Sequence, residues 1–334
     1  MAAPEAYAID DGTPVEYGKL ILAAAAEPGD VFQYTDGRAC YVVAVDDLAS
    51  GDEATVGLAG TIEVPLTTSV AAVLGMDAYW DESANAVIAV PGLSVGDFFL
   101  GTFAEDKAGG TDVRAKVHLN RRSRPMWSLK PGDAPGGQGI ADTVLETNGL
   151  AANGVRFLPS GLKIEFDAVS EAATASLLSG VAIPVADNIL FSAIVNVETN
   201  GDASAFDLVV GLANAGHATD PDSITESVFA SINGASTTIN AESDDGTTEV
   251  TATDTTKTFT AGTPFALWID ARTRADIQIY VNGVLVLPNS TFTLAAATGP
   301  MKALVLAEKT ANDTAAVVSV LDMKLYRIDD AAAA

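Results

Sequence analysis

The residues best suited to chemistry are three carboxylates in the middle of the chain, Glu165, Asp167 and Glu171. Carboxylates at alternating positions of a β-strand lie on one face a few ångströms apart, which is the pairing that glycoside hydrolysis needs. The pattern is incomplete, because three residues separate Asp167 from Glu171 and no Trp or Tyr lies nearby to stack on a sugar. Lys163 offers Glu165 a simpler role as an ion-pair partner. We therefore expect no catalytic residue here.

Two acidic clusters are candidates for calcium, which prefers oxygen ligands supplied by loops. They are Asp220, Asp222 and Glu226, and Glu242, Asp244, Asp245 and Glu249. Neither cluster has the regular ligand spacing around a central Gly that an EF-hand loop has. A chain this acidic also produces such runs by chance. We expect polar turns, no metal ligand and no cofactor.

The remaining reactive side chains are His118, His217 and Cys40. Neither histidine has a Cys, Ser or acidic partner at a spacing typical of a catalytic group. Cys40 lies in an apolar run, and one cysteine cannot form an internal disulfide. We expect it to be a small buried side chain.

The charge of the chain limits its partners. Its 334 residues include 18 Lys+Arg and 44 Asp+Glu, a formal net charge of -26. Such a charge disfavours binding to nucleic acid or to an anionic membrane. Residues 1–5 lack the features of a signal peptide, and no segment reaches the roughly 18 apolar residues of a membrane span. We expect synthesis in the cytoplasm and, from the length, two domains.

Residues 18–120 are predicted to form a small all-β domain, because short apolar runs alternate with turn residues such as Asp36-Gly37. Strands are expected at 19–22, 31–34, 39–45, 53–58, 60–65, 77–80, 86–90, 98–103 and 112–119. One short helix is expected over 67–75, where Thr67 offers a cap and Gly75 a stop. Residues 1–17 show no period and are expected to form an arm that orders on contact with a partner.

Seven motifs follow one another through this domain: Pro28-Gly29-Asp30, Val43-Ala44-Val45, Gly51-Asp52-Glu53, Gly60 to Pro65, Met76 to Asp81, Phe99 to Phe103 and Val113 to Leu119. Each motif alone is ordinary turn or strand chemistry. Their order resembles that of the capsid cement, or head decoration, proteins of tailed bacteriophages, over about a third of the chain.

The resemblance implies a β-barrel-like domain on the outside of an icosahedral shell, as a homotrimer at threefold or quasi-threefold positions. It also implies an N-terminal arm that pairs with a strand of the phage major capsid protein. The arm residues expected to bind the capsid are Glu5, Ala6, Tyr7, Ala8, Ile9 and Asp10. The apolar residues expected to make core or trimer contacts are Val64, Leu66, Val70, Leu74, Phe98 and Phe99.

Residues 121–137 are predicted to be a basic linker rich in Pro and Gly. Six of the 18 Lys+Arg lie within residues 114–130, whereas none lies between Arg38 and Lys107 or between Lys163 and Lys257. Arg121, Arg122 and Arg124 are candidates for a collar that docks on an acidic shell or neighbouring subunit. A solvated linker is the alternative.

Residues 138–330 are again rich in strand signals, and a short tail follows at 331–334. Asn282-Gly283 is a hairpin turn between alternating hydrophobic residues. With strands at 265–270 and 317–328, it resembles the late strands of concanavalin A-like lectin and glucanase domains. The resemblance implies a jelly-roll β-sandwich. Further strands are expected at 161–166, 188–197, 206–212 and 227–232.

These observations predict an all-β structural protein of the virion rather than an enzyme. It would bind the outer capsid surface, stabilise the expanded shell and display an outward β-sandwich. Its partners would be the major capsid protein and copies of itself, with no nucleic acid and no membrane. A lectin-like module for host-surface or environmental glycans is the first alternative, and a glycoside hydrolase is the second.

Overall fold

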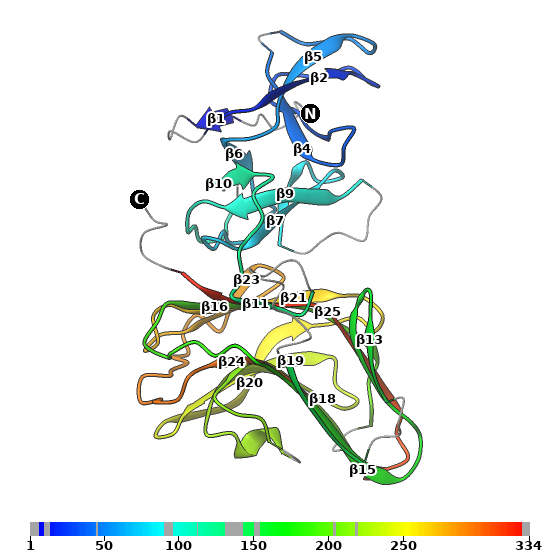
Figure 1. Cartoon of the computed structure of the whole chain (residues 1–334), viewed down its shortest axis with the longest axis vertical. Coiled ribbons are helices and arrows are strands. Elements are labelled where there is room, and N and C mark those ends of the chain that lie inside the picture. Colours follow the sequence, from blue (N-terminus) through cyan, green and yellow to red (C-terminus); the bar gives the residue numbers. More distant parts are fainter. Residues whose placement is uncertain are drawn as a thin grey trace. The chain divides into compact units, whose positions relative to one another are not determined.

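The computed structural model of the chain describes residues 7–9, 14–44, 46–89, 96–111, 113–130, 143–149, 154–202, 205–217 and 220–328. These residues form two compact units of antiparallel strands (Figure 1). One unit comprises Met1–Ser123 with Asn282–Val284, and the other comprises Arg124–Val281 with Leu285–Ala334. The predicted all-β class is confirmed. No helix within the described ranges has the length and apolar character to cross a bilayer.

The first unit contains two sheets. The six-stranded sheet has the order β1 (Tyr7–Ile9), β6 (Thr61–Pro65), β10 (Arg114–Leu119), β9 (Phe98–Phe103), β7 (Asp77–Asp81) and β8 (Ala86–Ile88). The four-stranded sheet has the order β2 (Tyr17–Ile21), β5 (Glu53–Gly57), β4 (Ala39–Val42) and β3 (Val31–Gln33). The predicted Asp36-Gly37 turn joins β3 to β4, and Gly37 has a φ of 88°.

Alternation of side chains builds the core of this unit. Along β10, Ala115, Val117 and Leu119 are buried, whereas the residues between them are half-buried. On the four-stranded sheet, Cys40 and Val42 belong to a cluster that also includes residues of β5. Apolar residues at every second position of a strand reach the same face, so each sheet has one face suited to a core.

The helix predicted over 67–75 is wrong. The segment forms two turns, in which Val70 N–H bonds to Thr67 O and Met76 N–H to Val73 O. Ala72 exchanges backbone hydrogen bonds with Lys107, at 2.9 Å in each direction. Residues Val70 to Val73 are all buried. A helix needs its N–H groups for internal bonds, whereas here several of them bond to residues distant in sequence, such as Lys107.

The second unit is a sandwich of two sheets. The eight-stranded sheet contains β13 (Val155–Leu158), β14 (Gly161–Phe166), β25 (Ala316–Arg327), β16 (Ile189–Thr199), β21 (Phe265–Ala271), β22 (Gln278–Val281) and β23 (Val284–Val286), with β11 (Trp127–Ser128) beside β25. The seven-stranded sheet has the order β12 (Thr143–Asn148), β15 (Glu171–Ser179), β24 (Lys302–Asn312), β17 (Phe206–Ala213), β18 (Glu226–Asn233), β19 (Thr238–Asp245) and β20 (Glu249–Thr258). A 3-10 turn, η3 (Pro221–Ser223), precedes β18.

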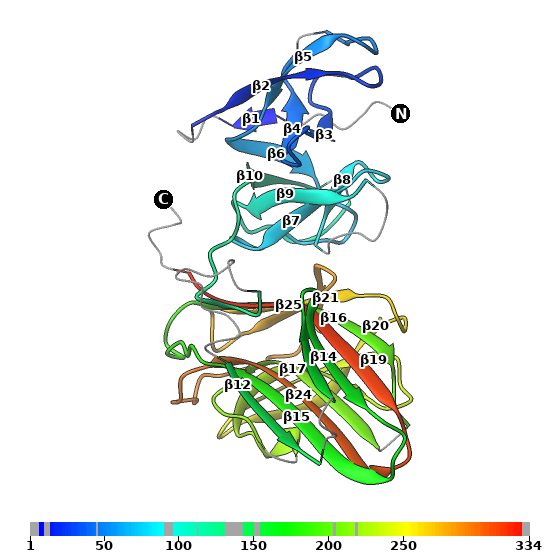
Figure 2. The same ribbon diagram turned by 45° about the vertical axis from the view of Figure 1, so that its right-hand side comes forward.

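The two sheets form the two layers of this sandwich (Figure 2). One large cluster of buried apolar side chains has members from both layers. Phe166 of β14 and Phe206 of β17 meet edge to face across the layers, with ring centroids 6.0 Å apart. The predicted jelly-roll sandwich is confirmed. The Asn282-Gly283 turn has φ values of 51° and 73°, as a two-residue hairpin with alternating neighbours requires.

Part of the segment predicted to be a linker lies in this sandwich. Trp127 pairs with Leu325 and is fully buried, and Ser128 pairs with Lys324. Leu129 is also in the core cluster. Because these side chains are apolar or small, they extend the sheet instead of remaining in solvent.

Candidate functional site

The strand β1 lies on the edge of the six-stranded sheet. Tyr7 pairs with Glu63, Ala8 with Ile62 and Ile9 with Thr61. The predicted capsid-binding residues Tyr7, Ala8 and Ile9 are therefore already paired with β6 of the same chain. The other three, Glu5, Ala6 and Asp10, lie outside the described residues.

The apolar residues predicted for core or trimer contacts divide by burial. Val64, Leu66, Val70 and Phe98 are buried, with exposed fractions of 0%, 5%, 6% and 9%. Leu74 and Phe99 are half-buried. The first four fit the core alternative, and only the last two have appreciable accessible surface for a neighbouring molecule.

The three arginines of the predicted collar are exposed. Arg122 lies over the ring of Phe99, 5.3 Å from its centroid, and Phe99 meets Tyr79 edge to face at 5.8 Å. No carboxylate among the described residues forms an ion pair with Arg121, Arg122 or Arg124. The aromatic ring of Phe99 orients the guanidinium of Arg122.

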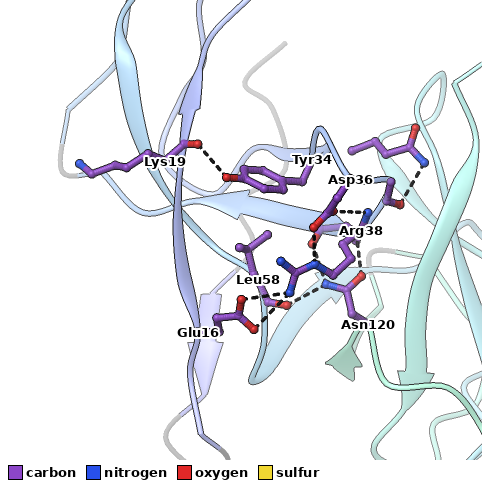
Figure 3. A network of polar contacts seen from close by, with 10 residues as sticks. Glu16, Lys19, Tyr34, Asp36, Arg38, Leu58 and Asn120 are labelled. Carbon is purple, nitrogen blue, oxygen red and sulfur yellow. Dashed lines mark hydrogen bonds and ion pairs between the residues drawn. The ribbon is translucent and has the colours of Figure 1, made fainter.

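A polar network fixes the four-stranded sheet to the end of β10 (Figure 3). The Asn120 side chain donates to Ala39 O at 2.7 Å and to Leu58 O at 2.8 Å, and accepts from Ala39 N at 2.7 Å. Asn120 has a φ of 57°, which Asn tolerates better than most residues. One amide thus bridges three segments far apart in sequence.

The same network contains the β3–β4 turn. Arg38 bonds both oxygens of Glu16 at 3.1 Å and Asp36 at 2.8 Å. A hydrogen bond from the Arg38 backbone, together with its guanidinium, lowers the pKa of Asp36. The Tyr34 hydroxyl donates to Lys19 O at 3.0 Å and so ties this turn to β2 (Figure 3).

The carboxylates considered for sugar hydrolysis do not form a paired site. Glu165 makes an ion pair with Arg156 across β13 and β14. Asp167 follows the end of β14 and accepts from Val169 N at 3.1 Å. Lys163 pairs with Glu198 at 2.8 Å, so its predicted pairing with Glu165 is wrong.

The acidic clusters considered for calcium hold loops together. Glu226 accepts from Thr298 N at 2.9 Å and Gly299 N at 2.8 Å, and Asp245 accepts from Thr247 N, Thr248 N and Ala296 N. Asp220 caps η3. These backbone hydrogen bonds lower the pKa of Glu226 and of Asp245 against the opposing effect of burial. Among the described residues no group of three or more carboxylate, His or Cys side chains is arranged to hold a metal ion.

An acidic face that the sequence did not reveal lies on the seven-stranded sheet. Asp207 stands opposite Glu308, and the pKa of each carboxyl is raised, chiefly by burial. Burial also raises the pKa of Glu242 to about 7, with the charges of Asp222, Asp207 and Glu249 adding to it. In the sequence, the only signal was one carboxylate on each of three strands, β17, β19 and β24. The strands β19 and β24 were not predicted. These groups exchange protons at higher pH than ordinary carboxyls.

The other reactive side chains have structural partners. Thr61 Oγ1 and His118 Nδ1 are 2.8 Å apart, and His217 Nδ1 accepts from Asp220 N at 3.0 Å. Cys40 is buried, and desolvation raises the pKa of its thiol to about 12. The three tryptophans, Trp80, Trp127 and Trp268, are 2%, 0% and 4% exposed. None of them presents a ring on which a sugar could stack.

Comparison with known proteins gives one family match. Residues 3–119 match the family model described as phage cement protein. No curated protein matches the chain significantly.

Solved structures resemble the chain only loosely. The carbohydrate recognition domain of Emp46p in its potassium-bound form shares 12% identity over 56% of this chain and 89% of that one, with a TM-score of 0.39. A structure from work on endo-acting O-glycanases of the human gut microbiota shares 9% over 61% and 100%, with a TM-score of 0.44. The carbohydrate-binding module CBM66 from Bacillus subtilis shares 13% over 53% and 94%, with a TM-score of 0.34. At these scores the similarities say nothing of what this chain binds.

Proposed function

We propose that the first unit of this chain is a phage cement domain, and that the protein binds the outer surface of a phage capsid and stabilises the expanded shell. The match of residues 3–119 carries the proposal. We further propose that the protein docks as a homotrimer at threefold and quasi-threefold positions. The second unit is then displayed outward.

The proposed mechanism is thermodynamic. A protein that binds the expanded shell, and no other state of it, stabilises that state by mass action. A trimer that touches several capsomers gains further, because its second and third contacts form at a high effective concentration. Each contact can then be small, below the roughly 1,200 Å² of a standard interface, and still be adequate in sum.

Within this proposal, the arm Glu5 to Asp10 pairs with a strand of the major capsid protein. The pairing of β1 with β6 supports this role, because Tyr7–Ile9 forms an extended strand that pairs with the edge of a sheet. The exposed Arg121, Arg122 and Arg124 would add attraction to acidic groups of the shell or of a neighbouring subunit.

The test is binding of the purified full chain to expanded capsids that lack it. We expect saturable binding in a sedimentation assay, delayed thermal disruption of the shells, and a trimer by analytical ultracentrifugation or on the shell. A chain without residues 1–13 should bind at least about tenfold more weakly, whereas removal of residues 331–334 serves as the matched control and should change nothing. Absence of binding by the intact chain would refute the proposal.

A further inference from the structure

We propose that the open edge of β2 accepts an extended, basic segment of the shell protein by strand addition. This inference rests on the proposed function and names the chemistry of the partner. It concerns Tyr17–Ile21, a different strand from β1, since β2 ends the four-stranded sheet and β1 ends the six-stranded one.

Among the described residues, no strand pairs with the side of β2 that faces away from β5. Gly18 and Leu20 lie opposite Val56 and Ala54 of β5. On either side of them, Glu16 O accepts from Leu58 N and Leu22 N donates to Asp52 O, so the even-numbered residues of this segment are the ones that bond to β5. In an antiparallel pair, alternate residues exchange both hydrogen bonds. The N–H and C=O groups of Tyr17, Lys19 and Ile21 therefore point away from β5. Of these, Lys19 O already accepts from the Tyr34 hydroxyl.

The side chains along this edge are unusually apolar for a surface. Ile21 and Tyr17 are 64% and 58% exposed, the highest values for large hydrophobic residues in the described part of the chain. Val15, which precedes β2, adds 39%. An edge strand with unpaired backbone groups and exposed apolar side chains is a template for another strand.

The neighbouring sheet surface is shaped by close packing. Tyr17, Gly57 and Tyr41 lie in one cross-strand row. A Cβ at Gly57 would come 2.2 Å from the Tyr41 ring, so this ring lies flat across the glycine. Tyr41 itself is only 4% exposed. The exposed Tyr17 therefore stands in one row with a buried, closely packed aromatic ring.

The charges around this edge favour a basic partner. Lys19 pairs with Glu53 at 3.2 Å, and Arg38 is occupied by Glu16 and Asp36. Residues 1–123 contain 7 Lys+Arg and 19 Asp+Glu, a net charge of -12. The loops beside the sheet contribute Glu27, Asp30 and Asp52. A second copy would bring the same acidic loops together, whereas a basic segment would be attracted to them.

The test uses two substitutions at one position of the full chain. Lys19→Pro removes the outward N–H and keeps the bonds of Gly18 and Leu20 to β5, and the glycine before it tolerates a following proline. Lys19→Ala removes the charge but keeps the N–H. In binding to expanded capsids that lack the protein, we expect Lys19→Pro to weaken binding at least about tenfold and Lys19→Ala to stay within about threefold.

A second variant guards against misfolding of the first. Tyr17→Ser with Ile21→Ser leaves the backbone intact and should also weaken binding at least about tenfold, while raised salt should weaken binding of the intact chain. Thermal unfolding of each variant shows whether the first unit is folded. If the folded variants bind like the intact chain, the inference fails and the proposed function stands. If the intact chain itself does not bind, both fail. If these variants instead abolish self-association of the free protein, the occupant is a second copy and the inference is wrong.

Discussion

Lys309 allows a stability prediction to be worked out from the geometry. This residue of β24 is 1% exposed, and its Nζ donates to Asp167 O and to Val169 O, each at 2.8 Å. Its neighbours in register are Ala173 and Phe206, both in the core. The ammonium therefore reaches from the end of the core to the turn between β14 and β15 and holds that turn in place.

Two effects of Lys309→Met oppose each other. Each hydrogen bond from a charged donor contributes about 1.5–3 kcal/mol. Removal of a buried ammonium relieves a desolvation cost of several kcal/mol. The two carbonyls belong to exposed residues, so water can replace part of what they lose. Since both bonds are short and direct, we expect a net destabilisation of the second unit by about 1–3 kcal/mol.

The measurement is urea unfolding followed by tryptophan fluorescence in a Trp80→Phe background. Trp80 lies in the first unit, whereas Trp127 and Trp268 lie in the second, so the remaining signal reports the second unit alone. With an m value of about 2–3 kcal/mol/M, the midpoint should fall by roughly 0.3–1.5 M.

The control for this experiment is Asp167→Asn. Its carboxylate is half-exposed and 3.8 Å from the Lys309 Nζ, so the pair should contribute no more than about 0.5 kcal/mol. An unchanged or higher midpoint for Lys309→Met would show that desolvation outweighs the two hydrogen bonds, and the reasoning above would be wrong.

Three further predictions concern other residues. Asn120→Ala should destabilise the first unit by about 2–4 kcal/mol, because three hydrogen bonds are lost; Asn120→Gly in the same melt separates this loss from the strain of a positive φ. The raised pKa of Glu242, about 7 in the folded chain against an ordinary 4.5, means that the folded state binds a proton more readily. Stability of the second unit should therefore fall as pH rises from about 4.5 to 7, by at most about 3 kcal/mol from this group, and Glu242→Gln should flatten that slope in melts across the range. Cys40 should resist a thiol reagent at pH 8 in the native chain and react in urea, because its pKa is near 12; rapid native labelling would contradict its burial.

Sequence patterns predicted the fold where turns and alternation coincide. The Asp36-Gly37 and Asn282-Gly283 hairpins were found because both turns need residues that accept a positive φ. Seven strands of the second unit were missed: β11, β12, β13, β15, β19, β20 and β24. Lys302–Asn312 is rich in Ala, Leu, Glu and Lys, which favour helices, and Glu249–Thr258 is an exposed edge strand without apolar alternation. Both segments form strands because they pair with neighbouring strands, and a local sequence pattern does not show that pairing.

The candidate site was predicted less completely than the fold. The order of turn motifs pointed to the phage cement family, whose model matches residues 3–119, since each motif is locally encoded. The exposed edge of β2 was not predicted, because Tyr17 was assigned to the arm and Ile21 looks like a core residue in a short apolar strand. Only the sheet order, with β2 at its end, shows that they face solvent. The acidic face around Asp207 and Glu308 depends likewise on which strands become neighbours.

The three-residue pairing of β1 with β6 would give capsid docking through the arm a kinetic signature. If the capsid strand takes the place of β6 as the partner of Tyr7–Ile9, β1 must first leave its own sheet, and the observed association rate would then level off at high shell concentration instead of rising without limit. The plateau would equal the rate at which β1 detaches. Substitutions in β6 that loosen this pairing would then speed docking, although they weaken the isolated protein.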